Sequence, residues 1–391
     1  MTEPTRPPLV LIFAVTATAL MSNSLITAIT PDIIDDFGLA DGQVGILVAS
    51  ASVAGIVVAP LIGFLADRHG RRRVLLPCLV VYGVFSVLGG LAPTFELLLT
   101  ARVLQGLGSA GLINLSVVLI ADNFDGEERA RLIGVNSAVL TASLAVYPTL
   151  GGLLADQWDW RVAFAPYAAT LVVAGFAWRY LVDTAPRVEA PYVDQLRAAI
   201  AEARRPIIGA TMVLALVTFV LIFGVFLAAM AIHLENEFGL GPSARGMIYA
   251  VPAVVSTLTA LSLGRLRRLV GPPTLVPLGV ALFGVAFLAI GLTGSLAVLI
   301  VAVAVYGVGE GISIPTLQDV AAGRSAPSLR GAIVAIWTGF ARTGQVVGPL
   351  LAGVAIDELG TAETFVIAAI GALGVAALVA ITRPYRSMAL A

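Results

Sequence analysis

The sequence predicts an all-α membrane protein of twelve transmembrane helices, arranged as two parallel six-helix repeats. Three observations lead to this fold class. The composition is far too apolar for a water-soluble surface, with 59% hydrophobic and 12% charged residues and a mean hydropathy of +0.98. The apolar residues gather into segments of about 20 residues, the length that crosses a hydrocarbon core of about 30 Å. The second half of the chain also repeats landmarks of the first half at a fixed spacing.

The twelve apolar segments follow one another along the whole chain, each with bounds good to a few residues. They lie near residues 9–30, 43–65, 74–92, 95–121, 132–155, 162–182, 207–233, 245–264, 274–293, 296–320, 331–355 and 362–382. The breaks between them carry turn residues, for example "DDFGLADG" at 35–42 and "GLGPS" at 239–243. The first segment is too long for a signal-peptide core and no small-residue cleavage site follows it, so we expect it to remain as the first helix.

Cysteine and histidine are scarce, which excludes several kinds of site. Cys78 is the only cysteine, and His69 and His233 are the only histidines and lie on different segments. We therefore expect no disulfide, no metal site and no cofactor.

The arginines predict the orientation, because cytoplasmic loops of membrane proteins carry the excess of basic residues. If twelve helices begin and end in the cytoplasm, nearly all arginines fall on the cytoplasmic side. Arg161 and Arg245 are the exceptions outside, and Arg102 and Arg342 lie inside apolar segments. We expect a multi-pass protein of the inner, cytoplasmic membrane of a prokaryote, with both termini in the cytoplasm.

An internal repeat with a constant offset of 201 residues organises the chain. The matching stretches are "DDFGLA" (35–40) with "NEFGLG" (236–241), "QGLGSAG" (105–111) with "YGVGEGI" (306–312), "YPTLGGLLAD" (147–156) with "GPLLAGVAID" (348–357), and Gly63, Gly70 and Arg129 with Gly264, Gly271 and Arg330. This predicts an N-terminal half at 1–182, a cytoplasmic linker at 183–206 and a C-terminal half at 207–391. Parallel repeats are one plan of secondary transporters, with the binding site between the halves near mid-membrane.

Three motifs carry a resemblance to a known family. The stretch "GFLADRHGRRR" at 63–73 is similar to the loop between helices two and three of that family, in Gly63, Asp67, Arg68, Gly70, Arg71 and Arg72; "RVLQGLGSA" is similar to its helix-four motif, in Arg102, Gln105, Gly106, Gly108 and Ala110. Pro148, Gly151 and Gly152 match part of a helix-five element of antiporters, but Ser143 and Tyr147 replace small glycines. The chain resembles the major facilitator superfamily over nearly all of its length, and within it the twelve-helix drug/proton antiporters.

The arginine-rich loop has a physical role that the resemblance extends. Gly63 and Gly70 permit close helix approach and a tight turn, and the arginines favour the anionic inner leaflet. The resemblance implies a cytoplasmic gate made of Gly63, Asp67, Arg68, Gly70, Arg71 and Arg72, with Asp122 as a partner for one of the arginines. The alternative is that the cluster only fixes orientation. Arg268 stands where Asp67 would repeat, so we expect the two halves to gate unequally.

A glycine pattern inside the fourth segment has two readings. "GLGSAG" at 106–111 fits the dinucleotide fingerprint, but that fingerprint needs a preceding strand and an acidic residue about 20 positions later. Here the glycines lie within a long apolar segment. We expect them to serve close helix packing instead.

Charged groups inside the membrane are costly, at about 2.5 to 3.5 kcal/mol each, and therefore indicate function. Glu310 and Arg342 lie roughly 20 Å and 18 Å from the same cytoplasmic loop, counting about 1.5 Å per residue, and could pair. Burial favours the neutral form of a carboxyl group and a nearby arginine favours the charged form, so Glu310 is our first choice for a proton site. A permanent structural pair is the alternative. Asp319 is a weaker candidate for the proton site. Arg102 either has a functional role, as the resemblance implies, or extends its side chain to the membrane–water interface.

Residues that could line a substrate site are polar or aromatic groups on the inner parts of the segments. They are Asn23, Thr27, Gln105, Asn114, Asn136, Tyr147, Phe219, Phe223, Phe226, Gln318, Trp337 and Gln345, and any one of them alone is more often a packing residue. An apolar cavity with few polar anchors suits amphipathic, drug-like molecules. Two interior arginines against one glutamate favour neutral or anionic substrates.

Together these features predict a secondary transporter that works by alternating access and exports small amphipathic compounds, with protons as the coupling ion. The alternative is a symporter or uniporter of organic anions or other metabolites. A membrane enzyme lacks the necessary residues, and a sensor or scaffold would need a partner for the linker. We expect a monomer in the lipid bilayer that binds small molecules and no nucleic acid.

Overall fold

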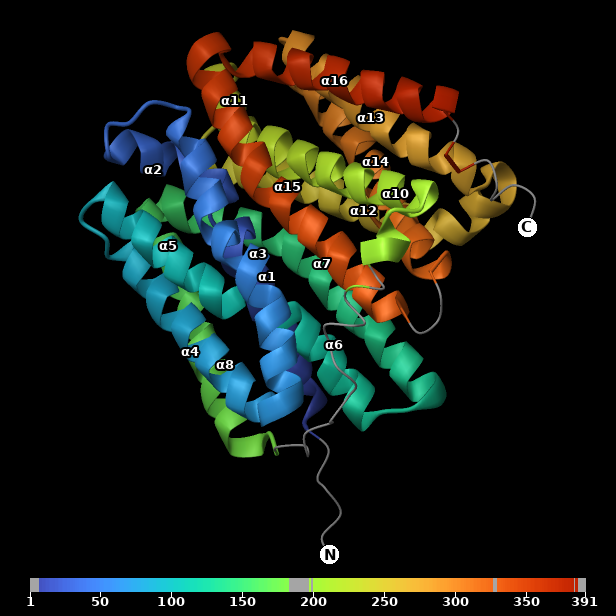
Figure 1. Ribbon diagram of the computed structural model, residues 1–391. Coiled ribbons are helices and arrows are strands. Elements are labelled where there is room, and N and C mark those ends of the chain that lie inside the picture. Colours follow the sequence, from blue (N-terminus) through green and yellow to red (C-terminus); the bar gives the residue numbers. More distant parts are fainter. Residues whose placement is uncertain (1–6, 183–196, 198–199, 326–328, 383, 386–391) are drawn as a thin grey trace, which may run out of the picture. The chain divides into compact units, whose positions relative to one another are not determined.

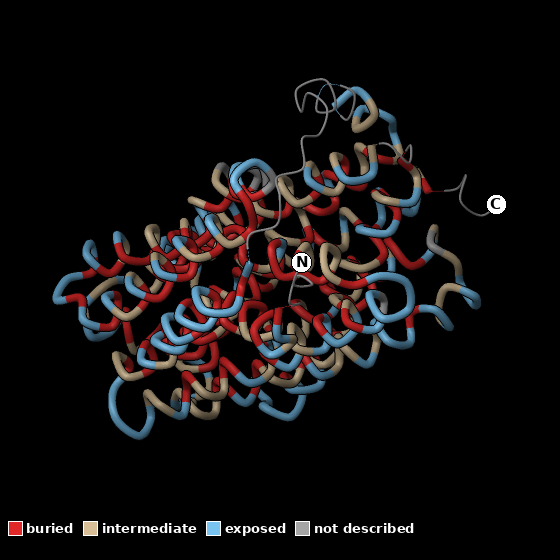
Figure 2. The backbone as a smooth tube through the Cα atoms, turned by 90° about the horizontal axis from the view of Figure 1, so that it is seen from below, coloured by how far each residue is buried: buried red, intermediate tan, exposed pale blue. Residues whose placement is uncertain are grey.

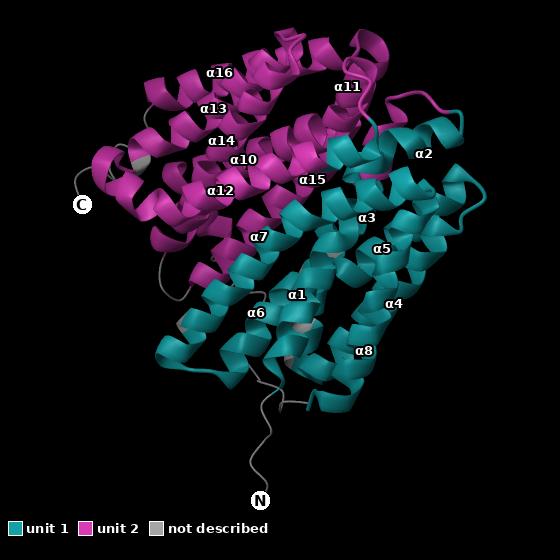
Figure 3. Ribbon diagram, turned by 180° about the vertical axis from the view of Figure 1, so that it is seen from behind, with its two compact units in different colours: residues 1–38, 50–189, 241–246 teal, residues 39–49, 190–240, 247–391 magenta. Residues whose placement is uncertain are grey.

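The computed structural model describes residues 7–182, 197, 200–325, 329–382 and 384–385, and these residues are helical or in short turns, with no strand among them (Figure 1). The chain divides into two compact units. Unit 1 comprises residues 1–38, 50–189 and 241–246, and unit 2 comprises residues 39–49, 190–240 and 247–391 (Figure 3). Each unit thus contains one short segment from the other half of the sequence. The predicted linker, 183–206, lies mostly outside the described residues.

The helices of the first half follow the predicted segments closely. They are α1 (Leu9–Ser24), the 3₁₀ segment η1 (Thr27–Ile29), α2 (Thr30–Asp36), α3 (Gln43–His69), α4 (Arg71–Gly90), α5 (Phe95–Ser109), α6 (Leu112–Asn123), α7 (Gly126–Gln157), the 3₁₀ segment η2 (Trp160–Tyr167) and α8 (Ala168–Tyr180). The first, fourth and sixth segments, which the sequence predicts as continuous helices, are each broken. In the fourth, a turn at Ala110 and Gly111 separates α5 from α6.

The second half has the same order of long helices. They are α10 (Pro206–Val220), the π-helical segment η3 (Leu221–Ala229), α11 (Met230–Asn236), α12 (Pro242–Val270), α13 (Pro272–Leu292), α14 (Leu296–Gly323), α15 (Arg330–Leu359) and α16 (Thr361–Thr382). Ten described helical segments are long and apolar enough to cross a membrane, and α3 and α15 are two further long helices. These twelve segments agree with the predicted all-α membrane fold.

The exposed surface is apolar along the helices, as a lipid-facing surface requires. Figure 2 shows exposed residues spread along the helices as well as at their ends. Among them are Val10, Leu261, Leu269 and Ile381, each at least 78% exposed. In water such a surface would drive association. In a bilayer this apolar surface contacts the lipid chains, in agreement with the composition.

The two halves repeat their internal packing. In unit 1, α4 packs against α5 and α8, and α1 packs against α7. In unit 2, α13 packs against α14 and α16, and α10 packs against α15. The third helix of each half therefore contacts the fourth and the sixth, and the first contacts the fifth. The repeat found in the sequence is a repeat of structure.

Glycines with positive φ close the turns at repeated positions. Gly70, with φ 97°, is the only residue between α3 and α4, and Gly271, with φ 69°, has the same place between α12 and α13. Gly38 and Gly239, also with positive φ, end the corresponding turns after α2 and α11. Residues with a Cβ rarely adopt this conformation, so the tight turns depend on glycine.

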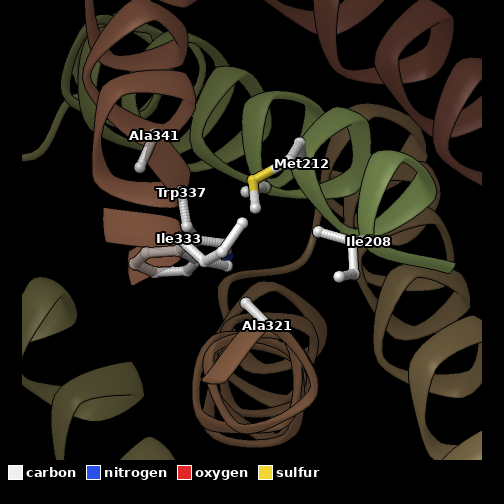
Figure 4. Packing of buried hydrophobic residues seen from close by; sticks show 7 residues of the cluster. Ile208, Met212, Ala321, Ile333, Trp337 and Ala341 are labelled. Atoms are coloured by element: carbon white, nitrogen blue, oxygen red, sulfur yellow. The ribbon is translucent and has the colours of Figure 1, made fainter. Parts of the chain in front are cut away.

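A compact cluster of apolar side chains joins α10, α14 and α15 in unit 2 (Figure 4). Its members are Ile208, Met212, Ala215, Ala321, Ile333, Trp337 and Ala341, all buried. The small Ala321 and Ala341 leave room for the large Trp337 ring. This packing buries Trp337, one of the residues predicted to line a substrate site.

The glycine run of the fourth segment is a packing device, as the sequence predicts. A Cβ on Gly106 would collide with the backbone oxygen of Ala51 on α3. A Cβ on Gly108 would lie 2.5 Å from the backbone nitrogen of Tyr82 and 2.6 Å from the oxygen of Cys78, both on α4. Glycine therefore lets α5 touch the backbones of two neighbouring helices.

We expect Gly108→Ala to destabilise the protein by about 1 to 3 kcal/mol, because the methyl group must displace the α4 backbone. Gly175→Ala is the matched control, since its Cβ would meet no atom within 4 Å on α8. There the exchange should be neutral or slightly stabilising, because alanine is the better helix former. Thermal unfolding in detergent measures both variants, and equal melting temperatures would contradict the packing role.

Candidate functional site

The first helix of each half departs from α-helical geometry at corresponding positions. In unit 1, α1 ends at Ser24 and a 3₁₀ turn follows at Thr27–Ile29. In unit 2, α10 ends at Val220 and continues as the π-helix η3. Interrupted membrane helices at matching places in two repeats point to the binding site of a transporter, and π-helical segments recur at functional sites. Each unit therefore contains candidate site residues of its own.

Arg102 on α5 lies at the break in α1. Its side chain is buried, with 1% exposure, which excludes the possibility that it reaches the membrane interface. Its Nη1 donates to the backbone oxygen of Ser22 at 2.5 Å and to Oε1 of Gln105 at 2.6 Å, and its Nη2 donates to Oδ1 of Asn23. The ion pairs of the described residues include none with Arg102. Neutral oxygens hold this charge in place.

The break in α1 explains why these donors are needed. The backbone N–H of Ile26 donates to Asn23 rather than to Ser22, so the Ser22 oxygen loses its usual helical donor. Arg102 and the hydroxyl of Tyr167, at 3.1 Å, both donate to it. An unpaired backbone oxygen inside a membrane protein is costly. Arg102 thus stabilises an interrupted helix and carries a charge at the same place.

Tyrosines surround this part of α1. Tyr82 donates to the oxygen of Thr18 at 2.9 Å, Tyr147 donates to Ala17 at 3.0 Å, and Tyr167 also donates to Met21 at 2.8 Å. Sequence reasoning named Tyr147 but missed Tyr82 and Tyr167. The signal available was a tyrosine within each of two apolar segments, where a hydroxyl requires a partner.

Other predicted lining residues of unit 1 have distinct surroundings. Asn136 is buried and its Oδ1 accepts from the hydroxyl of Thr16 at 2.6 Å. Thr27 is buried and donates to the oxygen of Asn23 at 2.7 Å. Asn23 is half-buried and reaches Oγ of Ser52 at 3.5 Å. Asn114 is exposed and lines a small pocket with Arg71 and Gly111. Asn23, Gln105 and Arg102 are thus brought together, whereas Asn114 lies apart from them.

In unit 2 the π-helix lies against α14. Phe226 stacks on Tyr306 with ring centroids 4.0 Å apart, and one helical turn further along α14 is Glu310. Glu310 is half-buried, and its carboxyl group lies beside the side chain of Ser256 on α12. No ion pair between Glu310 and Arg342 occurs among the described residues. The depth estimate from the sequence therefore did not translate into a contact in this structure.

Aromatic residues form a second group in unit 2. Phe219 stacks on Phe223, with centroids 6.1 Å apart, and meets Trp337 edge-on at 6.0 Å. Phe223 and Gln345 are half-buried, and Gln318 is exposed. Phe223 and Trp337 are therefore brought together through Phe219, and Gln318 is not part of this group.

Comparison with known proteins identifies the family. The model of the Major Facilitator Superfamily matches residues 11–228 and again residues 212–390. The chain belongs to this family. The bacillibactin exporter of Bacillus subtilis (strain 168) is 26% identical over 344 residues, covering 84% of this chain and 85% of the relative. Multidrug resistance protein 1 of the same organism is 25% identical over 343 residues, covering 87% of each chain.

Solved structures agree on the fold. A bacterial homolog of the human lysosomal transporter Spinster superposes with a TM-score of 0.74 at 19% identity, covering 96% of this chain and 94% of that one. The resemblance to the major facilitator superfamily, predicted from sequence motifs, is confirmed. Its relatives include one protein named an exporter and one named a multidrug resistance protein. Membership of the major facilitator superfamily makes the chain a multi-pass transporter of small substrates in a cell membrane, and not an enzyme.

The loop motif of the major facilitator superfamily is partly described here. Asp122, which the sequence suggested as a partner for one of the loop arginines, forms an ion pair with Arg71, with Nε and Oδ2 3.0 Å apart, and each side chain is only 10% exposed. Arg72 donates to the oxygen of Trp178 at 2.8 Å, and Arg68 is exposed. Beyond their place in α3, Gly63 and Asp67 lie outside the described part. The pair joins α4 to the end of α6.

The second half has a different ion pair near the end of α14. Asp319 on α14, the weaker proton-site candidate from the sequence, pairs with Arg267 on α12, with Nη1 and Oδ2 2.9 Å apart, and its side chain is 59% exposed. The two halves therefore carry different ion pairs.

We expect Arg102→Lys to lower the transport rate at least tenfold and to lower the melting temperature, because an ammonium group cannot reproduce the planar fork that reaches Ser22, Asn23 and Gln105. Arg129→Lys, an exposed exchange on α7, is the charge-matched control. Flux in proteoliposomes and thermal unfolding test both variants. A fully active Arg102→Lys would limit the role of Arg102 to its charge.

We expect the ion pair between Arg71 and Asp122 to contribute measurably to stability, since both side chains are largely buried. We expect Arg71→Gln and Asp122→Asn each to lower the free energy of unfolding. The loss in the double variant should be smaller than the sum of the two single losses, by at least about 1 kcal/mol. Melting temperatures of the four proteins in one detergent give the coupling. Strict additivity would show that the ion pair contributes nothing.

Proposed function

We propose that this transporter exports small amphipathic or drug-like compounds in exchange for protons, by alternating access. The observation that carries the proposal is Glu310, a carboxyl group on an apolar helix that lies beside Ser256 and forms no ion pair with an arginine among the described residues. Such a group can take up and release a proton without breaking an ion pair. Protons are then the coupling ion, and no cofactor is needed.

The energetics of one proton suffice for export. A potential of about 100 mV and a difference of about one pH unit together supply roughly 2.3 plus 1.4 kcal/mol for each proton. This supports a substrate gradient of about 500-fold. The names of the two long relatives, an exporter and a multidrug resistance protein, support the outward direction.

Two features of the site bear on the substrate. The aromatic group of Phe219, Phe223 and Trp337 offers stacking surface for an apolar body. Arg102 offers a charge that only neutral oxygens hold among its described contacts. We infer a preference for neutral or anionic amphipathic compounds. The arginine also supports the second candidate, import or facilitated passage of organic anions.

The remaining parts of the proposal concern location and assembly. The arginine distribution supports a chain in the cytoplasmic membrane of a bacterium, with both termini inside. The exposed helix surfaces suit lipid, and we propose that the transporter acts as a monomer with the inner gate at Gly70, Arg71 and Asp122.

We expect Glu310→Gln to abolish substrate-driven proton movement while leaving substrate binding within about threefold of wild type. Proteoliposomes with a pH-sensitive dye inside, challenged with cationic, neutral and anionic compounds, measure the flux. Glu96→Gln, which removes an exposed carboxylate on α5, is the control and should transport normally. Normal proton flux in Glu310→Gln would refute coupling at this residue, and transport of a compound without proton movement would favour the uniporter.

A further inference from the structure

The irregular first helices of the two halves are stabilised by different residues. In unit 1, the side chains that donate to backbone oxygens of α1 include Tyr82, Arg102, Tyr147 and Tyr167. The offset of 201 residues places Phe283, Val303, Gly348 and Ala368 at these four positions. None of these four residues has a side-chain donor. The π-helix η3 of the second half is therefore held by another residue.

Tyr249 on α12 supplies the missing donor. Its side chain is buried, and its hydroxyl lies 3.4 Å from the backbone oxygens of both Phe226 and Leu227 in η3. No other side chain in the described part of the chain donates to a backbone oxygen of η3. The distances are long for a hydrogen bond between two oxygens, so the contact is weak and easily released. The equivalent residue of the first half is Val48, which makes this donor a feature of the second half alone.

The ring of Tyr249 packs on the same turn of η3. It meets the ring of Phe226 edge-on, with centroids 5.4 Å apart, and Phe226 in turn stacks on Tyr306 of α14 at 4.0 Å. All three aromatic side chains are buried. The hydroxyl and the ring of Tyr249 together fix the direction in which the Phe226 side chain leaves η3.

Glycines hold η3 against α15. A Cβ on Gly224 would collide with the backbone oxygen of Gly348, and a Cβ on Gly348 would lie 2.7 Å from the backbone oxygen of Val220. The backbones of η3 and α15 are therefore in contact. Gly348 is the equivalent of Tyr147, so one difference between the repeats removes a hydroxyl donor and permits this approach. Because the packing on α15 is tight, the contact with Tyr249 is the adjustable one.

Close packing also fixes α14 against α12. A Cβ on Gly307 would lie 2.8 Å from the backbone oxygen of Pro252, and a Cβ on Gly311 would collide with that of Ser256. Neither helix can move toward the other without a clash. The element that can change at this place is η3.

The contacts of Tyr249 reach the proton site through Tyr306. Tyr306 lies one helical turn before Glu310 on α14. The carboxyl group of Glu310 and the hydroxyl of Tyr249 both act electrostatically on the hydroxyl of Tyr306. Phe226 therefore covers a residue that neighbours Glu310, and its direction sets the surroundings of that carboxyl group.

A π-helix is rare and persists where tertiary contacts support it. Conversion of η3 to an α-helix would rotate its residues about the helix axis, because the number of residues per turn changes. Phe226 would then leave Tyr306. We propose that Tyr249 is a positioning residue for Glu310, which keeps η3 π-helical and Phe226 stacked on Tyr306. This inference rests on the proposed proton exchange at Glu310.

Tyr249→Phe tests the first step, because it keeps the ring and removes the hydroxyl. In the full-length chain with Cys78→Ser, reconstituted in lipid nanodiscs, spin labels at Val213→Cys and Glu237→Cys span η3 from exposed positions. A π-helix has a smaller rise per residue than an α-helix, so conversion lengthens the segment. We expect Tyr249→Phe to raise the population at the longer distance at least threefold. An unchanged distance distribution would overturn the proposal.

Tyr385→Phe is the matched control. It also removes a buried tyrosine hydroxyl of unit 2, which lies 3.1 Å from the hydroxyl of Thr211 on α10, outside η3. Its distance distribution should equal that of the parent chain. A change as large as in Tyr249→Phe would show that the loss of any buried hydroxyl loosens this helix, and would overturn the specific role of Tyr249.

Infrared spectroscopy tests the step from η3 to Glu310. The carboxyl band that appears on acidification and is missing in Glu310→Gln belongs to Glu310, and its frequency depends on the hydrogen bonds and polarity around the group. We expect Tyr249→Phe to shift this band and Tyr385→Phe to leave it in place. Phe226→Leu removes the stack on Tyr306 but keeps the hydroxyl, and it should shift the band as well.

The two proposals fail in distinguishable ways. If the parent chain shows no band that Glu310→Gln removes, proton exchange at Glu310 is refuted, and the positioning role with it. If the band is present but stays unshifted in both Tyr249→Phe and Phe226→Leu, the positioning role alone is refuted. In proteoliposomes, the number of protons moved per substrate should fall at least twofold in Tyr249→Phe, and an unchanged ratio would also contradict the inference.

Discussion

The backbone of a membrane protein must satisfy its own hydrogen bonds, because hydrocarbon offers no partner. Most of this chain meets the constraint with continuous helices. At the break in α1 it does not, and the Ser22 oxygen is instead paired by Arg102 and Tyr167. The buried charge of Arg102 therefore hydrogen-bonds the irregular backbone at the break in α1, where the candidate site lies. The two features support each other: the break leaves the Ser22 oxygen as an acceptor for Arg102, and without Arg102 that oxygen would keep only the bond from Tyr167 at 3.1 Å.

The 201-residue repeat sets the helix packing, and charged residues at several equivalent positions differ between the two halves. Packing partners and turn glycines recur at equivalent positions. Several charged groups do not: Arg245 is matched by Val44, and Arg268 stands opposite Asp67. The turn glycines repeat because a residue with a Cβ rarely adopts their positive φ. Side chains such as these charged groups can diverge without altering the helix arrangement.

Sequence reasoning predicted the fold and most helix bounds, since apolar segment length and turn glycines are local signals. It predicted that Asp122 pairs with one of the loop arginines, because these residues flank the same membrane face, but it did not single out Arg71. It missed the breaks in segments one and seven, where propensity stays helical and only tertiary partners reveal the irregularity. It also missed Tyr82 and Tyr167. The depth of a residue along a helix can be counted from the sequence, whereas the direction of its side chain around the helix axis cannot. Glu310 and Arg342 were therefore placed at similar depth, but they form no ion pair among the described residues.

The two interior charges that the described contacts define most fully, Arg102 and Glu310, are held in the same manner. Arg102 donates to neutral oxygens, and Glu310 lies beside the hydroxyl-bearing Ser256. A permanent ion pair would neutralise each charge but would also fix it, because separating the partners leaves both unpaired in a low-dielectric interior. Neutral partners stabilise a charge less and release it more easily. This arrangement suits the proposed proton-coupled export, and it leaves the ion pairs Arg71–Asp122 and Arg245–Asp32 at the helix ends. Ion pairs at the helix ends and more easily released charges in the interior agree with the proposed alternating access.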